Sequence, residues 1–430
     1  MLRSVELVNL VQNRSLKYWV VPLLALLLSS ALQARELSVM TWNLGWHMDN
    51  ALFRQWLDAC SGRFARDRND GLWKPSPSGP ATGWELRWGR DAPIQWDIAR
   101  IPPCDVYQEN HRIVPPTTAA YAKRRQQIAE VIQRQAPDVI AFQEVSGKAA
   151  VLEILPDGGQ DYQVCSFEGY GVQRLAFAWR RTLGEAAEAC SAYAPLSLPA
   201  RPPEDRPRPG LALGLRVDGQ LLRLLNLHLK SGCVSPLESS DPNGRGQLAG
   251  NHSPCLVLQE QLQPLEAWLE QQSQGANRLM VLGDFNRNLA QEAARPPSEA
   301  VRPVRNPTDP YQPGIRSGNL WREINDGQPP TSKLTLLPIR CLEGPSAPLC
   351  EAAKTRLLTE DETNVLRNPA ALGCRNPVGL DGIAVSGTTN AIAEKVALGR
   401  FGRTRAADRA HPDPLLAVSD HCPLVGRFAF

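Results

Sequence analysis

The chain has 430 residues, of which 43% are hydrophobic and 21% are charged, and its formal net charge is +3. This composition is that of an ordinary globular protein, and it excludes a collagen-like, coiled-coil or disordered chain. The low net charge also excludes a strong overall field, so a nucleic-acid partner would have to be held by a local basic patch.

The N-terminus has the pattern of an export signal. A basic stretch through Lys17 precedes the apolar run Trp19–Leu28, and small residues follow up to Ala34. The run is shorter than the roughly 20 residues that a membrane-spanning helix needs. We therefore expect residues 1–34 to be a signal peptide and residues 35–430 to form a single domain that is periplasmic or secreted. An uncleaved N-terminal anchor is the alternative.

All 10 cysteines lie beyond this segment. An even number of cysteines in an exported chain favours disulfides, and none forms a CxxC pair that would indicate zinc or a redox dithiol. Sequence alone does not define the connectivity. Pairing of neighbours, such as Cys165 with Cys190 and Cys233 with Cys255, is the arrangement we prefer, in an oxidising compartment.

The first buried strand is predicted at residues 37–44 (LSVMTWNL). Residues 47–118 then lack sustained periodicity and are predicted to form an ordered insertion, held by a link between Cys60 and Cys104. Six of the 11 tryptophans lie between residues 46 and 96. We expect these rings to form a small separate core. An aromatic platform beside the active site is the alternative.

The rest of the chain reads as an α/β domain. An amphipathic helix at residues 121–135 leads into the apolar strand 138–145 (DVIAFQEV), and a hairpin turn is predicted at Asp218-Gly219-Gln220. Residues 195–209 contain six prolines and are predicted to be an exposed loop. A second insertion is expected at about residues 290–375. The remaining predicted elements are strands 175–179, 211–217, 221–229, 279–282, 379–385 and 424–430, and a helix at about residues 256–272.

Polar groups gather at the ends of these apolar strands. Ligands collect there because a sheet holds them rigidly while the adjoining loops leave them accessible. Carboxylates, carboxamides and histidines in one such row indicate a hard-cation site beside acid–base groups, which suits a phosphate ester. Taken singly, each residue could instead be a turn former or a structural histidine. The row consists of Asn43, Glu144, Asn226, His228, Asp284, Asn286, Asp381, Asp420 and His421.

The motifs TWN, PDVIAFQEV, LNLHLKS, GDFN, LDGI and SDH occur in this order along the chain. In this respect the chain resembles the endonuclease/exonuclease/phosphatase superfamily with the deoxyribonuclease I-like fold. The resemblance covers residues 37–430 apart from the two insertions. It implies a four-layer α/β sandwich, in which two packed mixed β-sheets are flanked by helices.

The resemblance also implies a metal site. Glu144 matches the family's main metal ligand, usually for Mg²⁺, with Mn²⁺ or Ca²⁺ as alternatives. Asn43 would lie beside it and hold the metal or the phosphate. Asp420 would complete the metal and hydrogen-bond shell.

The remaining positions match residues that act on the phosphate. Asp284 matches the residue that orients or deprotonates the attacking water, and Asn286 a donor to the developing pentacovalent phosphate. His421 matches a histidine that contacts the scissile phosphate, with its ring held by Asp381. The LNLHLKS motif adds three more residues. His228 would be another phosphate-facing histidine, and Asn226 would lie next to it and bind substrate. Lys230 would contact a flanking phosphate, and a solvated lysine at the end of the strand is the alternative.

Together these features predict an exported metal-dependent phosphodiesterase. We expect it to be a nuclease of low sequence specificity that hydrolyses nucleic acid. We also expect a monomer with no obligate protein partner. Gly45 stands where relatives specific for damaged DNA often have Asp, which weakens a repair function. One alternative substrate is a phospholipid or sphingomyelin, with the Trp-rich insertion docking on the membrane. Another is an inositol or sugar phosphate. A non-catalytic binding protein is the remote alternative, because every predicted catalytic residue is present.

Overall fold

The computed structural model describes residues 36–86, 88, 93–233, 246–294, 318–344, 346–356, 358–367, 372–374, 379–387 and 389–429. The predicted signal peptide and part of the second predicted insertion lie outside these residues. Among the helices described, none is long and apolar enough to cross a membrane.

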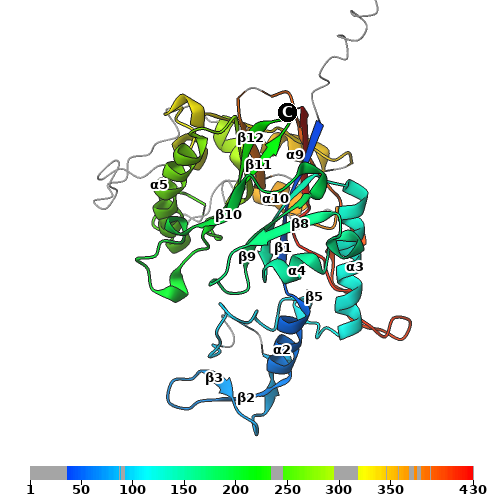
Figure 1. Cartoon of the computed structure of the whole chain (residues 1–430). Coiled ribbons are helices and arrows are strands. Elements are labelled where there is room, and N and C mark those ends of the chain that lie inside the picture. The colour runs from blue at the N-terminus through cyan, green and yellow to red at the C-terminus, as the bar shows by residue number, and fades with distance from the viewer. Residues whose placement is uncertain are drawn as a thin grey trace, which may run out of the picture.

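Two mixed β-sheets form the centre of the molecule (Figure 1). The seven-stranded sheet contains two parallel strand pairs, β1 with β7 and the short pair β15 with β17. The six-stranded sheet contains one, β12 with β13. All other neighbouring strands in the two sheets are antiparallel. The seven-stranded sheet has the order β15 (Ile339–Arg340), β17 (Ala393–Lys395), β18 (Leu424–Ala429), β1 (Glu36–His47), β7 (Val139–Val145), β9 (Arg174–Arg180) and β8 (Tyr162–Ser166). The six-stranded sheet has the order β10 (Glu188–Tyr193), β11 (Gly210–Val217), β12 (Gln220–His228), β13 (Arg278–Arg287), β16 (Leu380–Ser386) and β14 (Leu334–Leu336).

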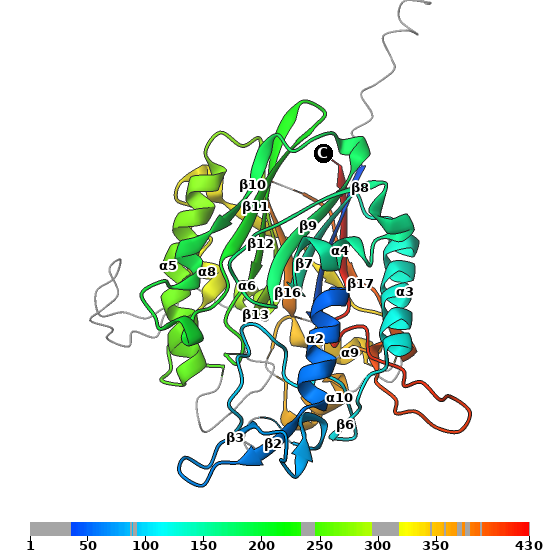
Figure 2. The ribbon, with the colours of Figure 1, turned by 60° about the horizontal axis from the view of Figure 1, so that its bottom comes forward.

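The sheets pack face to face and helices cover their outer faces (Figure 2). The shared core between the sheets contains inward-facing residues of both, such as Val39, Phe177 and Leu224. A second core lies under α3, and a third lies under α5, on the opposite side of the molecule. The predicted four-layer α/β sandwich is therefore confirmed. The helices are α2 (Asn50–Ser61), α3 (Thr118–Gln135), α4 (Lys148–Leu152), α5 (Ser253–Ser273), α6 (Leu289–Ala294), α8 (Leu320–Glu323), α9 (Ala347–Ala353) and α10 (Glu360–Arg367).

The predicted hairpin forms between β11 and β12. Asp218 and Gly219 both have positive φ, which is the backbone conformation that lets a tight turn follow the twist of two antiparallel strands. The Pro-rich stretch 195–209 differs from the simple exposed loop that was predicted. It contains two short 3₁₀ turns, Ala194–Ser197 and Pro203–Asp205, and buries Leu196 against the core under α5.

The first insertion projects from one end of the sheets, where α2, β2 and β3 lie (Figures 1 and 2). Its lack of sustained periodicity did not reveal α2, which begins after the cap residue Asp49 and buries Phe53 and Trp56. Short strand pairs follow: β2 (Arg63–Arg66) with β3 (Trp73–Pro75) and β4 (Ala81–Thr82), and β5 (Gln108–Glu109) with β6 (Arg112–Ile113).

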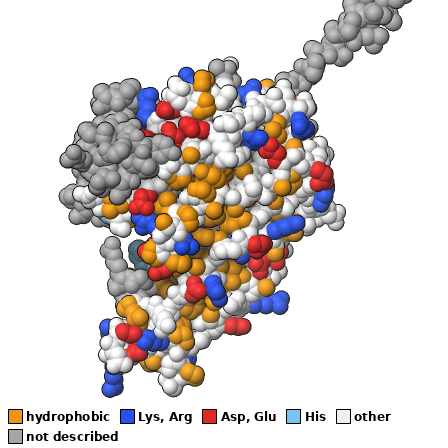
Figure 3. Space-filling model, turned by 60° about the vertical axis from the view of Figure 1, so that its left-hand side comes forward, with side chains coloured by type: hydrophobic (Ala, Val, Ile, Leu, Met, Phe, Trp, Pro, Cys, Tyr) orange, Lys and Arg blue, Asp and Glu red, His pale blue; other side chains and the backbone are white. Residues whose placement is uncertain are grey.

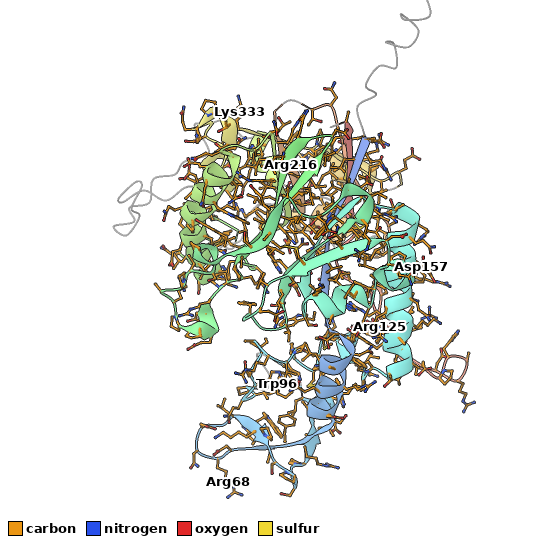
Figure 4. All side chains as sticks on the ribbon, in the orientation of Figure 1. Arg68, Trp96, Arg125, Asp157, Arg216 and Lys333 are labelled. Atoms are coloured by element: carbon orange, nitrogen blue, oxygen red, sulfur yellow. A yellow bond between two sulfur atoms is a disulfide. The ribbon has the colours of Figure 1, made fainter. Side chains whose placement is uncertain are left out.

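Most tryptophans of the insertion pack against one another, as expected, but their core is continuous with α3 through Tyr121. Trp56 meets Trp84 edge to face at 5.2 Å between ring centroids, and Trp88 meets Trp96 at 4.7 Å. Arg68 marks the far end of the projection, and Trp96 lies nearer the sheets (Figure 4). Trp46 differs from this group, because it lies on β1 and lines the cleft described below.

All 10 cysteines are paired, in five disulfides. The expected Cys60–Cys104 link is present and closes the first insertion, and the preferred neighbour pairs are also formed. Five disulfides are typical of a protein that folds in an oxidising, extracellular or periplasmic environment. The pairs are Cys60–Cys104, Cys165–Cys190, Cys233–Cys255, Cys341–Cys350 and Cys374–Cys422.

A buried histidine lies at the end of β1, where the chain leaves the sheet for the insertion. His47 Nδ1 lies 2.7 Å from Arg124 Nη1 and 3.2 Å from the Tyr121 hydroxyl, while Nε2 donates to Ala150 O at 3.2 Å. Because a guanidinium only donates hydrogen bonds, Nδ1 must be the acceptor, which requires a neutral ring. Burial lowers the pKa of His47 well below its ordinary value, and the charge of Arg124 acts in the same direction.

This pKa shift predicts a pH-dependent stability. Above about pH 6.5 the imidazole is neutral in both states, but at lower pH the unfolded chain takes up a proton that folded His47 rejects. The free energy of unfolding should then fall by up to about 1.4 kcal/mol per pH unit for this group. Urea unfolding at pH 7.5, 6 and 5 should show a shallower loss for His47→Gln than for wild type. His411→Gln, at an exposed position, is the control, and equal slopes in all three proteins would contradict the prediction.

Candidate active site

Strand register places one histidine and two aspartates of the predicted site side by side. In the six-stranded sheet His228 on β12 lies opposite Asp284 on β13, and Asp284 lies opposite Asp381 on β16. The three residues therefore form one row across three neighbouring strands. In the facing sheet Asn43 on β1 lies opposite Gln143 on β7, with Glu144 next along the chain.

Hydrogen bonds between the two sheets bring these rows together. Asn43 Nδ2 donates to Asp284 Oδ2 at 3.0 Å and to Glu144 Oε1 at 3.2 Å. Deeper between the sheets, Gln143 Nε2 donates to Asn226 Oδ1 at 2.8 Å. The site is thus built across the packing interface and belongs to neither sheet alone.

Local distortions of the strands aim the side chains at this junction. The ladders lose their regular register after Asn43, Phe142 and Asp284, as β-bulges do near active sites. Glu144 and Asn286 both have positive φ, a strained conformation for these residues that is concentrated at functional sites. Gly283 is required by close approach, because a Cβ there would lie 2.0 Å from Leu227 O.

Asp284 is buried at the centre of the site. Its Oδ1 accepts from Asn286 N at 2.8 Å, and its Oδ2 lies 3.4 Å from His228 Nε2 and 3.8 Å from His421 Nε2. Burial raises the pKa of Asp284 to about 6, against the opposing charge of His421. A carboxylate with a pKa close to neutrality is suited to accept a proton from water.

His421 and Asp381 form a hydrogen-bonded pair with Lys395 behind it. His421 Nδ1 lies 3.0 Å from Asp381 Oδ1, and buried Lys395 pairs with Asp381 Oδ2. Burial by itself lowers the pKa of His421, but the charges of Asp381 and Asp284 outweigh it and raise the pKa to about 10. Burial likewise opposes the charge on Asp381, yet Lys395 and His421 lower its pKa to about 2. At neutral pH the site therefore holds an imidazolium fixed by an ionised carboxylate.

His228 has the opposite protonation state. Burial lowers its pKa well below the ordinary value, helped by the positive charges of Arg208, His421 and Lys230. Its Nε2 points toward Asp284 and Glu144, whereas buried Nδ1 has no hydrogen-bond partner among the described residues. The two histidines therefore supply one neutral and one charged imidazole.

A cleft of about 910 Å³ opens onto these groups. It is lined by the junction of the two sheets, by the end of the first insertion and by segments before β18. The insertion contributes Asp105 and Glu109, and the segment before β18 contributes Arg403 and adjoins the insertion, because Ala406 N donates to Glu109 Oε2 at 2.8 Å. The predicted site residues that line the cleft are Asn43, Glu144, His228, Asp284, Asn286, Asp420 and His421.

Two residues predicted to bind substrate lie elsewhere. Asn226 is fully buried and does not line the cleft, because its amide nitrogen donates to Phe142 O and Ala176 O while its oxygen accepts from Gln143. Lys230 is also absent from the lining, and its Nζ donates to Ser231 O. Asn226 therefore links the sheets in this structure and does not reach the cleft.

Sequence reasoning missed several residues that hold the site. Lys395 is the counter-ion of Asp381, and Gln173 donates to Glu144 Oε2 at 2.7 Å. Neither lies in a recognisable motif. Ser419 could have been found, because it belongs to SDH: its hydroxyl donates to Asn43 O at 2.6 Å and accepts from His421 N at 2.9 Å.

Side-chain oxygen atoms that border the cleft are suited to ligate a hard divalent cation. Glu144 Oε1 and the exposed carboxylate of Asp420 both border the cleft, beside Asn43. Ligand atoms of Asp284, Asp381 and His421 also lie within 4.8 Å of one another, close enough to hold an ion. Lys395 already neutralises Asp381, however, and protonated His421 has no free lone pair for a metal. The Glu144 side is therefore the better-suited metal position.

The fold and the site define a class of protein: a two-sheet sandwich with acidic and imidazole groups at one junction. The model of the Endonuclease/Exonuclease/phosphatase family matches residues 40–300, and the chain belongs to this family. Members of the family are phosphoric ester hydrolases and generally use divalent metals. No curated protein matches the sequence.

Solved structures with a similar fold are remote in sequence. Humanized D. rerio TDP2 carrying 14 mutations is 12% identical, with 92% of this chain and 99% of that chain covered and a TM-score of 0.39. The human Nocturnin catalytic domain with bound sulfate is 16% identical, with 78% and 93% covered and a TM-score of 0.38. A Bacteroides thetaiotaomicron protein of the same family is 12% identical, with 92% and 98% covered and a TM-score of 0.41. Similarity at this level indicates no substrate.

One disulfide adjoins the site and gives a testable prediction. Cys422 follows His421 directly, and its partner Cys374 lines the cleft. Removing this link with Cys374→Ala/Cys422→Ala frees the segment that places the imidazolium. Hydrolysis of a small chromogenic phosphodiester should fall at least about tenfold, because small misplacements of a reacting group are costly. The double variant Cys341→Ala/Cys350→Ala is the control and should retain activity at a temperature where both double variants are folded. Equal rates of hydrolysis in the two double variants would show that the Cys374–Cys422 disulfide does not position His421.

Proposed function

We propose that this chain is an exported, metal-dependent phosphodiesterase whose substrate is nucleic acid. One observation carries the proposal: a buried carboxylate, an imidazolium, a neutral imidazole and a carboxamide all face a single cleft. Phosphodiesters repel anionic nucleophiles, so hydrolysis requires positive charge where negative charge develops. The site combines that charge with a base of suitable pKa.

The proposed chemistry assigns a task to each side chain. Asp284 orients a water molecule and takes its proton as the water attacks phosphorus, in line with the leaving oxygen. His421, fixed by Asp381, neutralises charge on the phosphate oxygens, and Asn286 donates a further hydrogen bond with the N–H that Leu229 O leaves free. No covalent intermediate on the enzyme is needed.

Glu144, Asn43 and Asp420 are the residues that would hold the divalent cation. When bound there, such an ion supplies Lewis-acid charge stabilisation to the phosphate. Glu144 is held for this purpose by three donors: Asn43 Nδ2 on one oxygen, and Trp46 N and Gln173 Nε2 on the other.

Features of the cleft support nucleic acid as the substrate. Trp46 lines the cleft next to Glu144, and an aromatic ring beside a phosphate site can stack on a base. Gln108 and Asn110 of the insertion also line the cleft and add side-chain amides. On the face drawn in Figure 3, acidic and basic side chains are interspersed. Because the formal net charge of the chain is only +3, a single strand bound in the cleft fits better than a duplex held by a broad positive surface.

A second candidate is a sugar or inositol phosphate. Asp105 and Glu109 on the wall of the insertion would repel a polyanion, whereas carboxylates readily accept hydrogen bonds from hydroxyl groups. A lipid substrate has less support. The tryptophans that would dock on a membrane pack within the insertion. Among the described residues of the insertion, Ile98 is the large apolar side chain that is strongly exposed.

The assignment of base and imidazolium predicts strong losses on substitution. Asp284→Asn and His421→Asn should each lower kcat at least about 100-fold, because each removes proton transfer or charge stabilisation. His411→Asn, at an exposed histidine, is the matched control and should keep wild-type turnover. Circular dichroism would verify that the variants are folded. Wild-type kcat in a folded Asp284→Asn or His421→Asn protein would exclude the proposed roles.

The substrate is best identified with a panel. Purified mature protein would be assayed with Mg²⁺ and with EDTA on plasmid DNA, single-stranded DNA, RNA, sphingomyelin and an inositol phosphate. We expect EDTA-sensitive cleavage of single-stranded nucleic acid, lost in Asp284→Asn. Trp46→Ala should raise KM for that strand by roughly tenfold through lost stacking. Cleavage of inositol phosphate alone would support the proposed mechanism and contradict nucleic acid as the substrate. If none of these esters is cleaved, the proposed enzymatic activity is contradicted.

A further inference from the structure

A chain of three side chains leads from the Pro-rich segment to the proposed metal ligand. Arg208, two residues before β11, donates through Nη2 to Gln173 Oε1. Gln173 in turn donates from Nε2 to Glu144 Oε2 at 2.7 Å. Neither Arg208 nor Gln173 lines the cleft, so their hydrogen-bonded path to the site runs through Glu144.

The chemistry of arginine fixes the direction of this chain. A guanidinium has five N–H donors and no acceptor, so Gln173 must turn its oxygen toward Arg208. Its NH₂ group then necessarily faces Glu144. Without Arg208 the amide could rotate by half a turn, which would set its oxygen against the carboxylate and remove one of the three hydrogen bonds that hold Glu144.

Arg208 is held in place at a desolvation cost. Its Nε is buried and has no hydrogen-bond partner among the described residues. A partly desolvated guanidinium is unfavourable unless negative charge lies nearby. The electrostatic influence of Arg208 on His228 and Lys230 indicates that its charge reaches the site.

We propose that Arg208 and Gln173 are positioning residues that lock the orientation of Glu144 and thereby set the affinity of the cation site. This inference rests on the proposed function, because Glu144 is the metal ligand assigned there. Partners that orient a metal ligand through its free atoms commonly change metal affinity or activity by about 10- to 100-fold.

The test measures metal binding directly. Isothermal titration calorimetry with Mn²⁺ or Mg²⁺ would compare wild type with Arg208→Met, Arg208→Lys and Gln173→Glu. Arg208→Met should weaken binding about 10- to 100-fold. Arg208→Lys keeps a donor for Gln173 and should recover most of the affinity. Gln173→Glu keeps a partner for Arg208 but loses the donor to Glu144, so it should bind as weakly as Arg208→Met.

A matched control lies on the same segment. Arg201 is ion-paired with Glu260 at 2.6 Å, outside the site, so Arg201→Met should keep wild-type affinity. The Mg²⁺ concentration for half-maximal hydrolysis should shift with the calorimetric affinity, whereas KM at saturating Mg²⁺ should not.

The outcomes separate the two proposals. Wild-type protein that binds metal, together with equal affinity in folded Arg208→Met and Gln173→Glu, would overturn the positioning role and leave the proposed function intact. A raised KM with unchanged metal affinity would also overturn it, because Arg208 would then contact substrate. Wild-type protein that binds no divalent cation would overturn both.

Discussion

The site depends on one amide at the junction of the two sheets. Asn43 Nδ2 is shared between Glu144 of its own sheet and Asp284 of the facing sheet, and so holds two carboxylates close together that would otherwise repel each other. The donor can reach both only because the sheets pack face to face at this end. Any change in that packing would separate the proposed metal ligand from the proposed base.

The distribution of positive charge then gives the two buried aspartates different roles. Asp381 faces Lys395 and the imidazolium of His421, so it stays ionised and serves to orient the ring. Asp284 has no lysine or arginine within ion-pairing distance among the described residues, and burial raises its pKa to about 6. Two carboxylates on adjacent strands are thus suited by their environments to be an anchor and a base, a common way to divide acid–base work within one site.

The first insertion influences the cleft through its polar end. Its tryptophans stabilise the projection internally, and Cys60–Cys104 fastens the chain just before the wall that carries Asp105 and Glu109. The insertion therefore borders the cleft without supplying any of the proposed catalytic groups. This division is typical of enzymes in which a rigid scaffold performs chemistry and added loops select the substrate.

The sequence by itself indicated eight of the central strands, the hairpin turn and the row of polar residues, because alternation and turn residues are local signals, and the order of the motifs implied the two-sheet fold through the family resemblance. It also indicated three of the five disulfides through neighbouring cysteines. Only the tertiary structure showed the contacts of Lys395, Gln173 and Arg208, since an isolated residue far away in the chain gives no local sign of its partner. Asn226 shows the same limit: it shares a strand face with His228, but two residues of rise place it deep between the sheets, where the facing sheet takes every hydrogen bond that the cleft might have used.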